Sequence, residues 1–182
     1  MRCGPPPRRR SATSSTSRSK SFHLRPLLRS ARPDDHAAIV ALTDAAFAGE
    51  EEALRIVREV EPEISLVYED EGAIVGHVML SRMEMGEHRP FQLSPLSVAP
   101  SHQNRGIGSQ LTREALRLAD EAGEPFVLLL GHPTYYPRFG FEPALPLGLE
   151  PPRDFGEAWM AVKLTAYDPS IRGRVVFPPA FG

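Results

Sequence analysis

The sequence lacks the features that would point to a membrane, redox or metal protein. No apolar run among its 182 residues approaches the roughly 20 residues of a membrane helix, and the amino terminus has no continuous apolar centre of a secretory signal. The single cysteine, Cys3, cannot form an internal disulfide or a thiolate zinc site, and the six histidines show no paired metal spacing. We therefore expect a soluble cytoplasmic protein that uses no metal and no membrane.

Acidic residues are absent from the first 32 positions. That segment holds nine of the 21 lysines and arginines, so the rest of the chain has 12 basic and 23 acidic residues, a balance of −11. An acidic body of this kind is not expected to bind nucleic acid, and it favours cationic substrates.

Large apolar side chains are almost missing from the first 21 residues, which are rich in proline, serine and arginine. Such a segment cannot bury enough surface to offset the entropy lost on ordering. We expect a disordered leader at 1–21 and one folded domain at 22–182. A solvated, nonessential extension is the favoured interpretation of the leader, and a transit peptide or a nucleic-acid-binding tail remains open.

Hydrophobic periodicity predicts a strand within 27–35, which ends at Pro33, followed by two helices. Asp34 or Asp35 would cap the first helix, and Pro62 would stop the second. The stripes expected to be buried are Ile39, Leu42, Ala46 and Phe47, then Leu54, Ile56, Val57 and Val60. A hairpin of two β-branched strands within 64–85, turning at Gly72, comes next.

Pro95 interrupts the fourth expected strand, within 91–100. Because proline removes a ladder hydrogen bond, we expect a bulge from Pro95 to Val98 that leaves backbone groups free for a ligand. A long amphipathic helix then closes at Gly123, and the apolar run 125–131 suits a central strand that is parallel to the fourth. A helical turn at 133–139 and two further strands, one starting at Gly140 and one within 158–164, complete the order.

Two glycines, Gly106 and Gly108, open the long helix. The first turn of a helix presents unpaired N–H groups and a positive dipole end, and glycines allow an anion to approach them closely. The glycines follow the fourth expected strand rather than the first, which argues against a dinucleotide fold. A P-loop would need a Gly-Lys-Ser/Thr triplet, and the chain has none.

The stretch LSVAPSHQNRGIGSQLTREAL, residues 96–116, resembles the acyl-CoA-binding signature of the GNAT superfamily of N-acetyltransferases. Gln103, Gly106 and Gly108 match its pattern Gln/Arg-x-x-Gly-x-Gly/Ala. YYPRFGF at 135–141 resembles the aromatic-Tyr-x-x-hydrophobic-Gly-Phe ending of the same superfamily. RGRVVFPPAF is similar to the end of a bacterial subfamily of predicted N-acetyltransferases, so the resemblance covers roughly residues 25–182.

The resemblance implies an α/β (α+β) fold, in which a mixed, mostly antiparallel twisted sheet has a bulged fourth strand splayed from the fifth and is flanked by helices. It also implies transfer of an acetyl group from acetyl-CoA to a primary amine of a small molecule or protein. The cofactor-binding residues would be Leu96, Ser97, Val98, Gln103, Asn104, Arg105, Gly106, Ile107, Gly108 and Ser109. Backbone groups of Leu96 and Val98 would hold the pantetheine arm like an added strand.

Tyr136 matches the tyrosine that protonates the leaving thiolate in many members of the superfamily, so it is the candidate general acid. The Val98 N–H, or one beside it, would stabilise the oxyanion. Glu84, Glu87, His88 or an ordered water could serve as the base, and no spacing distinguishes them. His132 stands where many members have an asparagine, and His77 is expected to be a satisfied structural residue.

The other aromatic residues of the second motif, Tyr135, Phe139 and Phe141, are expected to pack, and Arg138 to face solvent or a cofactor phosphate. A non-catalytic acyl-CoA-binding sensor or interaction module is the alternative function, since it would need the glycines but not Tyr136. The identity of the acceptor and the choice between a monomer and a homodimer are left open by the sequence.

Overall fold

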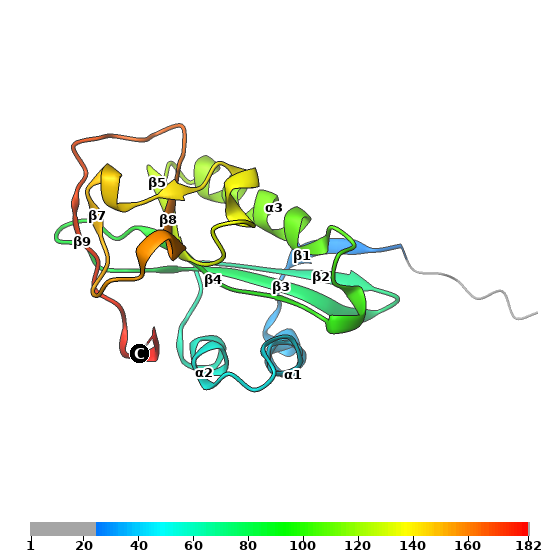
Figure 1. The fold of residues 1–182 in the computed structure, drawn as a ribbon. Coiled ribbons are helices and arrows are strands. Elements are labelled where there is room, and N and C mark those ends of the chain that lie inside the picture. The colour runs from blue at the N-terminus through cyan, green and yellow to red at the C-terminus, as the bar shows by residue number, and fades with distance from the viewer. Residues whose placement is uncertain (1–24, 182) are drawn as a thin grey trace, which may run out of the picture.

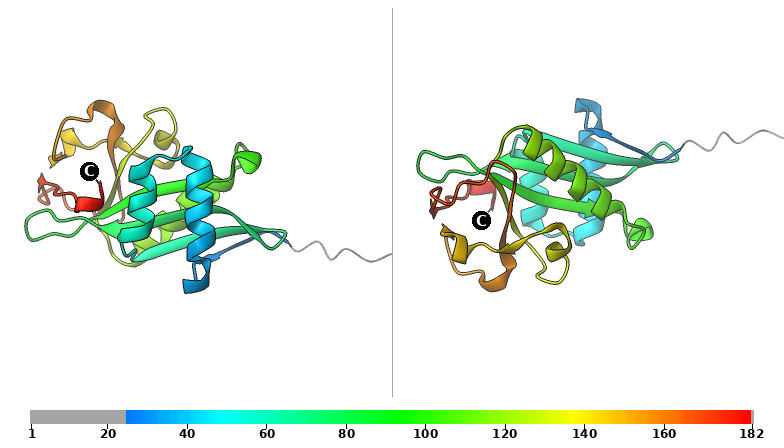
Figure 2. Two further views of the ribbon diagram at one scale, coloured as in Figure 1. Left: turned by 90° about the horizontal axis from the view of Figure 1, so that it is seen from below. Right: turned by 90° about the horizontal axis from the view of Figure 1, so that it is seen from above.

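The computed structural model describes residues 25–181, so the leader expected at 1–21 lies outside the described part. A seven-stranded sheet with the order β1-β2-β3-β4-β5-β8-β6 runs through the described residues. Two helices, α1 and α2, cover one face, and α3 covers the other (Figure 1). Figure 2 shows α1 and α2 side by side across the strands.

The elements have the following bounds. The helices are α1 (His36–Phe47), α2 (Glu51–Glu59) and α3 (Ile107–Glu121). The strands are β1 (Leu27–Ser30), β2 (Ile64–Asp70), β3 (Ala73–Arg82), β4 (Phe91–Val98), β5 (Phe126–Leu130), β6 (Glu142–Pro143), β7 (Leu149–Glu150), β8 (Trp159–Lys163) and β9 (Gly173–Arg174). Short 3₁₀ turns include η3 (Tyr136–Phe139) and η6 (Pro179–Phe181).

Asp35 occupies the N-cap of the first helix, as the sequence predicts, but its carboxylate accepts from the Arg32 N–H at 2.7 Å and from no N–H of that helix. Arg29 on β1 lies 2.7 Å from the Asp35 carboxylate and lowers the pKa of that group to about 2. Ile39 and Leu42 are buried as expected, but Thr43 is buried beside them. Ala46 and Phe47, which we expected in the core, are only half-buried. The helix ends at Phe47, where the chain leaves the sheet, so these two side chains line a cleft instead.

In the second helix, Leu54, Ile56 and Val57 are buried as predicted, whereas Val60 lies beyond the last helical residue and is half-buried. The hairpin of β2 and β3 also forms as predicted. Its turn places Gly72 at a φ of 83°, a conformation that glycine adopts without steric strain.

The bulge in β4 lies earlier than we predicted. Val78 pairs with Leu96 and Leu80 pairs with Leu93, so β4 has one more residue than β3 between these two pairs. The extra residue falls within 94–95, and Ser97 and Val98, which we placed in the bulge, pair regularly with His77 and Gly76. The prediction was correct that the bulge includes Pro95, but it extended the bulge too far towards α3.

The fourth and fifth strands diverge as predicted. They are parallel, and within residues 25–181 they pair only at Phe91 with Val127 and at Gln92 with Leu128. Past the bulge, β4 bends away from β5 and the two strands enclose an open wedge. All other neighbours in the seven-stranded sheet are antiparallel.

Gly76 on β3 allows α3 to lie close to the sheet at this wedge. A Cβ at Gly76 would lie 2.7 Å from Ile107 Cγ2 and 2.9 Å from Leu111 Cδ1. Those distances are shorter than van der Waals contact, so any other residue would push the start of α3 outwards.

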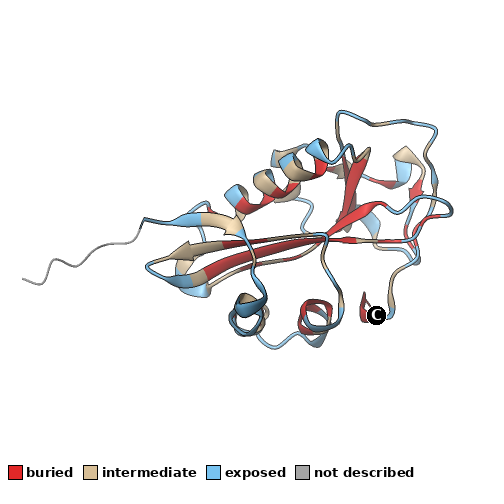
Figure 3. Cartoon of the chain, turned by 180° about the vertical axis from the view of Figure 1, so that it is seen from behind, coloured by how far each residue is buried: buried red, intermediate tan, exposed pale blue. Residues whose placement is uncertain are grey.

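Two apolar cores lie on the two faces of the sheet (Figure 3). The central strand β5 contributes to both, since Phe126 and Leu128 face one core and Val127 and Leu129 face the other. The small parallel pair of β7 and β9 was not predicted. Each of these strands has two residues, too few for hydrophobic alternation to be visible in the sequence.

Candidate functional site

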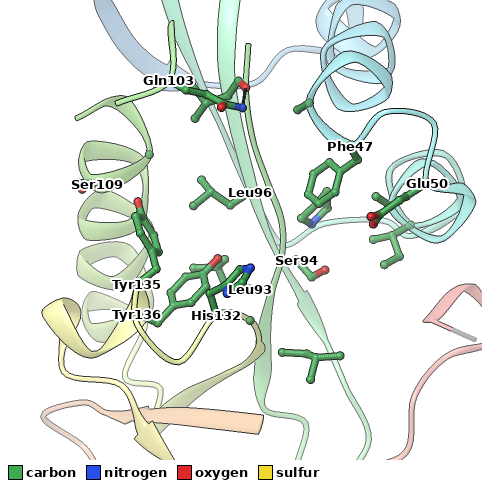
Figure 4. Close-up of a pocket in the computed structure, with 18 of the residues that line it drawn as sticks. Phe47, Glu50, Leu93, Ser94, Leu96, Gln103, Ser109, His132, Tyr135 and Tyr136 are labelled. Atoms are coloured by element: carbon green, nitrogen blue, oxygen red, sulfur yellow. Dashed lines mark hydrogen bonds between the residues drawn. The ribbon is translucent and has the colours of Figure 1, made fainter. Parts of the chain in front are cut away.

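A cleft of about 1010 Å³ opens where β4 and β5 diverge. One side is formed by the start of α3 and the turn η3, and the other by the end of α1, the start of α2 and the carboxy-terminal residues. Figure 4 shows Tyr135, Tyr136 and His132 on one side of β4, with Phe47 and Glu50 on the other. The cleft is large enough to hold a long ligand across the edge of β4.

The start of α3 presents free amide groups to this cleft. Gly106 is the N-cap, with a φ of 82°, and apart from its neighbours in the chain no atom of residues 25–181 lies within 4 Å of where its Cβ would be. The first helical hydrogen bond runs from the Gln110 N–H to the Gly106 carbonyl at 3.1 Å. The N–H groups of residues 107–109 therefore have no acceptor within the helix and can bind an anion.

Most of the predicted cofactor-binding residues line the cleft, namely Leu96, Val98, Gln103, Asn104, Gly106, Ile107, Gly108 and Ser109. Ser97 does not, because its side chain is buried on the other face, 3.1 Å from the Thr43 hydroxyl. Arg105 is exposed and is not part of the lining either. Gln103 donates from Nε2 to the Val98 carbonyl at 3.1 Å, so its side chain holds the loop before α3 in place.

The register of β4 directs two of its N–H groups towards the cleft. The Ala99 N–H donates to the Val75 carbonyl at 2.9 Å, which makes that pair the hydrogen-bonded one. Because hydrogen-bonded and non-hydrogen-bonded pairs alternate along an antiparallel ladder, Val98, opposite Gly76, turns its N–H away from β3. Leu96, two residues earlier, has the same orientation.

Tyr136 lies in a turn that β5 leads into. The His132 carbonyl accepts hydrogen bonds from the Tyr135 N–H at 3.0 Å and the Tyr136 N–H at 3.4 Å. The Tyr136 ring packs edge-on against Phe141, with centroids 5.6 Å apart, and a Cβ at Gly131 would collide with that ring. Burial raises the pKa of the Tyr136 phenol above its ordinary value, and nearby Tyr135 adds to the shift. The phenol therefore keeps its proton at neutral pH.

Tyr135 reaches the start of α3 on the same side of the cleft. A Cβ at Gly108 would lie 2.9 Å from the Tyr135 hydroxyl, so glycine at this position makes room for the phenol as well as for a ligand. Arg138 donates to the Tyr135 carbonyl at 2.8 Å and lies 4.5 Å from the centre of its ring. Phe141 is buried and Phe139 half-buried, in agreement with their predicted packing role.

The candidate bases are not brought to this site. Glu84, Glu87 and His88 are exposed beyond the end of β3, and none of them belongs to the cleft lining as residues 25–181 define it. His132 does line the cleft with an exposed side chain, and its backbone caps the turn.

His77 is structural, but it is only half satisfied. It is buried between the sheet and α1, and its Nε2 lies 3.0 Å from the Ser65 hydroxyl. Its Nδ1 has no hydrogen-bond partner among the described residues. Burial lowers the pKa of its imidazole to about 4.

The sequence reasoning missed the α1 and α2 side of the cleft. The residues there that were not predicted as site residues include Phe47, Glu50, Glu52, Ile56, Gln92, Phe177 and Phe181. They come from separate segments of the chain and match no motif, so no local signal could have identified them.

Neither a metal cluster nor a membrane-spanning helix is present within residues 25–181. No group of three or more His, Cys, Asp or Glu side chains there is placed to hold a metal ion. None of the helices in that range combines the length and the apolar composition needed to cross a bilayer.

Comparison with known proteins identifies the family. A model described as an acetyltransferase (GNAT) domain matches residues 28–144, a range that includes both Gly106 and Tyr136. The chain belongs to the GNAT acetyltransferase family. This confirms the predicted family and fold class.

Individual relatives agree with that assignment. The uncharacterized N-acetyltransferase YjhQ of Escherichia coli K12 is 35% identical over 123 residues, which are 63% of this chain and 68% of the relative. YhbS of the same strain, also an uncharacterized N-acetyltransferase, is 34% identical over 123 residues, or 64% of this chain and 73% of the relative.

Two solved structures are similar over most of the chain. The Escherichia coli YhbS structure in complex with CoA has a TM-score of 0.76 at 30% identity, over 87% of this chain and 92% of that chain. A GNAT family acetyltransferase from Brucella melitensis in complex with acetyl-CoA has a TM-score of 0.70 at 30% identity, over 88% of this chain and 100% of that chain.

Proposed function

We propose that the protein is an N-acetyltransferase that moves an acetyl group from acetyl-CoA to a primary amine of a small molecule or protein. The observation that carries this proposal is the convergence of three groups on one cleft. They are the free amides at the start of α3, the outward N–H of Val98 and the protonated phenol of Tyr136.

The diphosphate of acetyl-CoA binds at the start of α3 in this proposal. The amides of residues 107–109 and the positive end of the helix dipole attract a negative charge. This local attraction offsets repulsion from the acidic residues in the rest of the chain. Arg138 also lines the cleft and can add a charge-assisted contact. The similarity to structures that contain CoA or acetyl-CoA supports this placement.

The pantetheine arm lies along β4 past the bulge, where β5 no longer pairs with it. Backbone groups of Leu96 and Val98 hold the arm as a neighbouring strand would. The Val98 N–H then faces the thioester carbonyl and stabilises the negative charge that develops on its oxygen when the amine attacks.

Proton transfer completes the reaction. As the new C–N bond forms and the C–S bond breaks, the departing sulfur takes a proton from the Tyr136 hydroxyl. The raised pKa of Tyr136 keeps that proton in place until the thiolate forms. The amine must arrive neutral, and we assign removal of its proton to water, since Glu84, Glu87 and His88 lie away from the cleft.

Release of free thiol from acetyl-CoA over a panel of amines, amino acids, aminoglycosides and peptides tests this function. We expect turnover with at least one amine and none without an acceptor. Binding of acetyl-CoA, seen as a raised melting temperature, without thiol release for any amine would instead support a non-catalytic acyl-CoA-binding module.

A further inference from the structure

The half of the cleft opposite Tyr136 is bounded by segments that are far apart in the sequence. We call it the α2 half and define it by Phe47, Glu50, Glu52, Ile56, Gln92 and Phe177. Figure 4 shows Phe47 and Glu50 facing the cleft across Ser94 from Tyr136. Phe181 also lines the cleft.

The aromatic residues of the α2 half are held in place by packing and by a hydrogen bond. Phe177 packs against Phe181 with ring centroids 5.7 Å apart and stacks on Phe155 at 5.9 Å. The Arg55 guanidinium on α2 donates to the Ala180 carbonyl at 3.0 Å, which ties the carboxy-terminal turn to the helix. The α2 half therefore presents preformed aromatic and aliphatic surface, and apolar ligand groups can be buried against it.

A buried polar group lies in the same half without a partner. Gln92 lines the cleft and is 2% exposed, and its Oε1 accepts no hydrogen bond from residues 25–181. Ser81, opposite Gln92 on β3, likewise has a buried hydroxyl with no partner in the described part of the chain. Buried polar atoms in folded proteins are nearly always paired. An N–H group on a bound ligand would provide the missing donor.

Charge favours a cationic ligand at the mouth of this half. Glu50 and Glu52 are exposed and line the cleft, and they are the charged residues of the α2 half as defined above. They attract an ammonium group from solution, whereas the apolar interior favours the neutral amine that the reaction needs.

We propose that the α2 half is the acceptor subsite and that it takes a primary amine borne on an apolar aryl or branched alkyl group. Gln92 accepts a hydrogen bond from the amine N–H and orients its lone pair, and Phe47, Ile56 and Phe177 surround the apolar group. A polyhydroxylated aminosugar would lose hydrogen bonds to water against this wall and gain few in return. This substrate class rests on the proposed acetyltransferase function.

Substrate preference is the first test. Phenethylamine and isoamylamine are compared with glucosamine, kanamycin and an Nα-acetylated lysine peptide by thiol release at saturating acetyl-CoA. We expect kcat/KM to be at least about tenfold higher for the two apolar amines. Preference for the sugars or the peptide would overturn the proposal while leaving the acetyltransferase function intact.

Variants of two acidic residues provide a matched comparison. The double variant Glu50→Gln, Glu52→Gln should lower kcat/KM for phenethylamine several-fold, whereas Glu51→Gln, which changes the residue between them outside the cleft lining, should not. All three side chains are exposed, so the fold should tolerate these substitutions. Equal effects of the double variant and Glu51→Gln would contradict the role of the cleft carboxylates.

Gln92→Leu tests the hydrogen bond to the amine. It should raise KM for phenethylamine about tenfold and leave acetyl-CoA affinity unchanged, because a hydrogen bond to the amine is lost but the diphosphate site is untouched. A melting curve of this variant checks the fold. An unchanged KM in a folded variant would remove Gln92 from the subsite.

Calorimetric titration of phenethylamine into the CoA-saturated protein separates the two proposals. Binding that weakens in the Glu50→Gln, Glu52→Gln variant, without turnover of any amine, would support the subsite and reject the enzyme. Turnover of polar amines with no binding of phenethylamine would support the acetyltransferase function and reject the apolar acceptor subsite.

Discussion

At the scale of single residues, the surroundings of Tyr136 decide its chemistry. Its ring fits against the bare backbone of Gly131 and packs on Phe141, and this burial raises the pKa of the phenol. A raised pKa makes the phenol a weaker acid than free tyrosine, so its proposed role as proton donor depends on placement against the departing sulfur rather than on acid strength. Burial of His77 has the opposite effect, because it disfavours the charged imidazolium.

Tyr136→Phe should lower kcat by about 100-fold, since a positioned general acid contributes rate factors of this order. Acetyl-CoA affinity should stay within about twofold, because the ring and its packing are retained. Steady-state kinetics and calorimetry measure the two quantities. Tyr135→Phe is the matched control, and we expect a smaller loss of kcat. Equal turnover of Tyr136→Phe and the parent protein would exclude Tyr136 as the acid.

His77 should make the protein less stable in mild acid. The pKa of its imidazole is about 4 in the folded state and near 6.5 when unfolded, so between these values the unfolded chain binds a proton that the folded one does not. The free energy of unfolding should therefore fall by up to about 3 kcal/mol from His77 as pH drops from 6.5 to 4. Above pH 6.5 this residue should have no effect.

Urea unfolding at a series of pH values measures this contribution when the parent is compared with His77→Gln. Both proteins share the titration of their carboxylates, so the difference between the two curves isolates the imidazole. Parallel curves over this pH range would show that His77 protonates equally in both states.

At the scale of elements, one bulge and one helix start produce the site. The extra residue in β4 turns the strand away from β5, and Gly76 lets α3 lie over the gap that results. Because α3 begins at a glycine in a left-handed conformation, its first amides point into that gap rather than at the side chain of a capping residue.

Gly106→Glu should abolish acetyl-CoA binding without unfolding the domain. The new carboxylate would place a negative charge where we propose that the diphosphate binds, and calorimetry would measure the loss. Gly123→Glu is a matched control at the other end of α3. Gly106 and Gly123 have φ values of 82° and 77°, and apart from chain neighbours neither has a described atom within 4 Å of its Cβ position, so the backbone strain should be alike. Unchanged affinity in Gly106→Glu would reject the anion site.

At the scale of the whole molecule, the two sides of the cleft favour ligand groups of opposite charge. The α3 side offers backbone donors to an anion, and the α2 half offers carboxylates and aromatic surface to an amine. Strands β4 and β5 join these sides with only two pairs of residues in the described part of the chain. A ligand that spans the wedge adds contacts where the sheet has few of its own, and it should stabilise the fold as a unit.

Acetyl-CoA should therefore raise the melting temperature in a concentration-dependent way. Ligand at about 100 times its dissociation constant stabilises a folded protein by about 2.7 kcal/mol, which corresponds to several degrees for a chain of this size. Thermal unfolding monitored by circular dichroism would measure the shift. The Gly106→Glu variant should show none, and a shift in that variant equal to the parent's would place the ligand elsewhere.

The sequence by itself determined the order of the main elements, the start of α3 at its glycines and the position of Tyr136 in the second motif. These features depend on residues close together in the chain, where periodicity, capping and glycine conformations act. Only the tertiary structure decided that Phe47 faces the cleft, that the Gln92 Oε1 is buried with no partner among the described residues and that Phe177 lines the α2 half. Burial and pairing depend on contacts between distant segments, and no local pattern in the sequence specifies them.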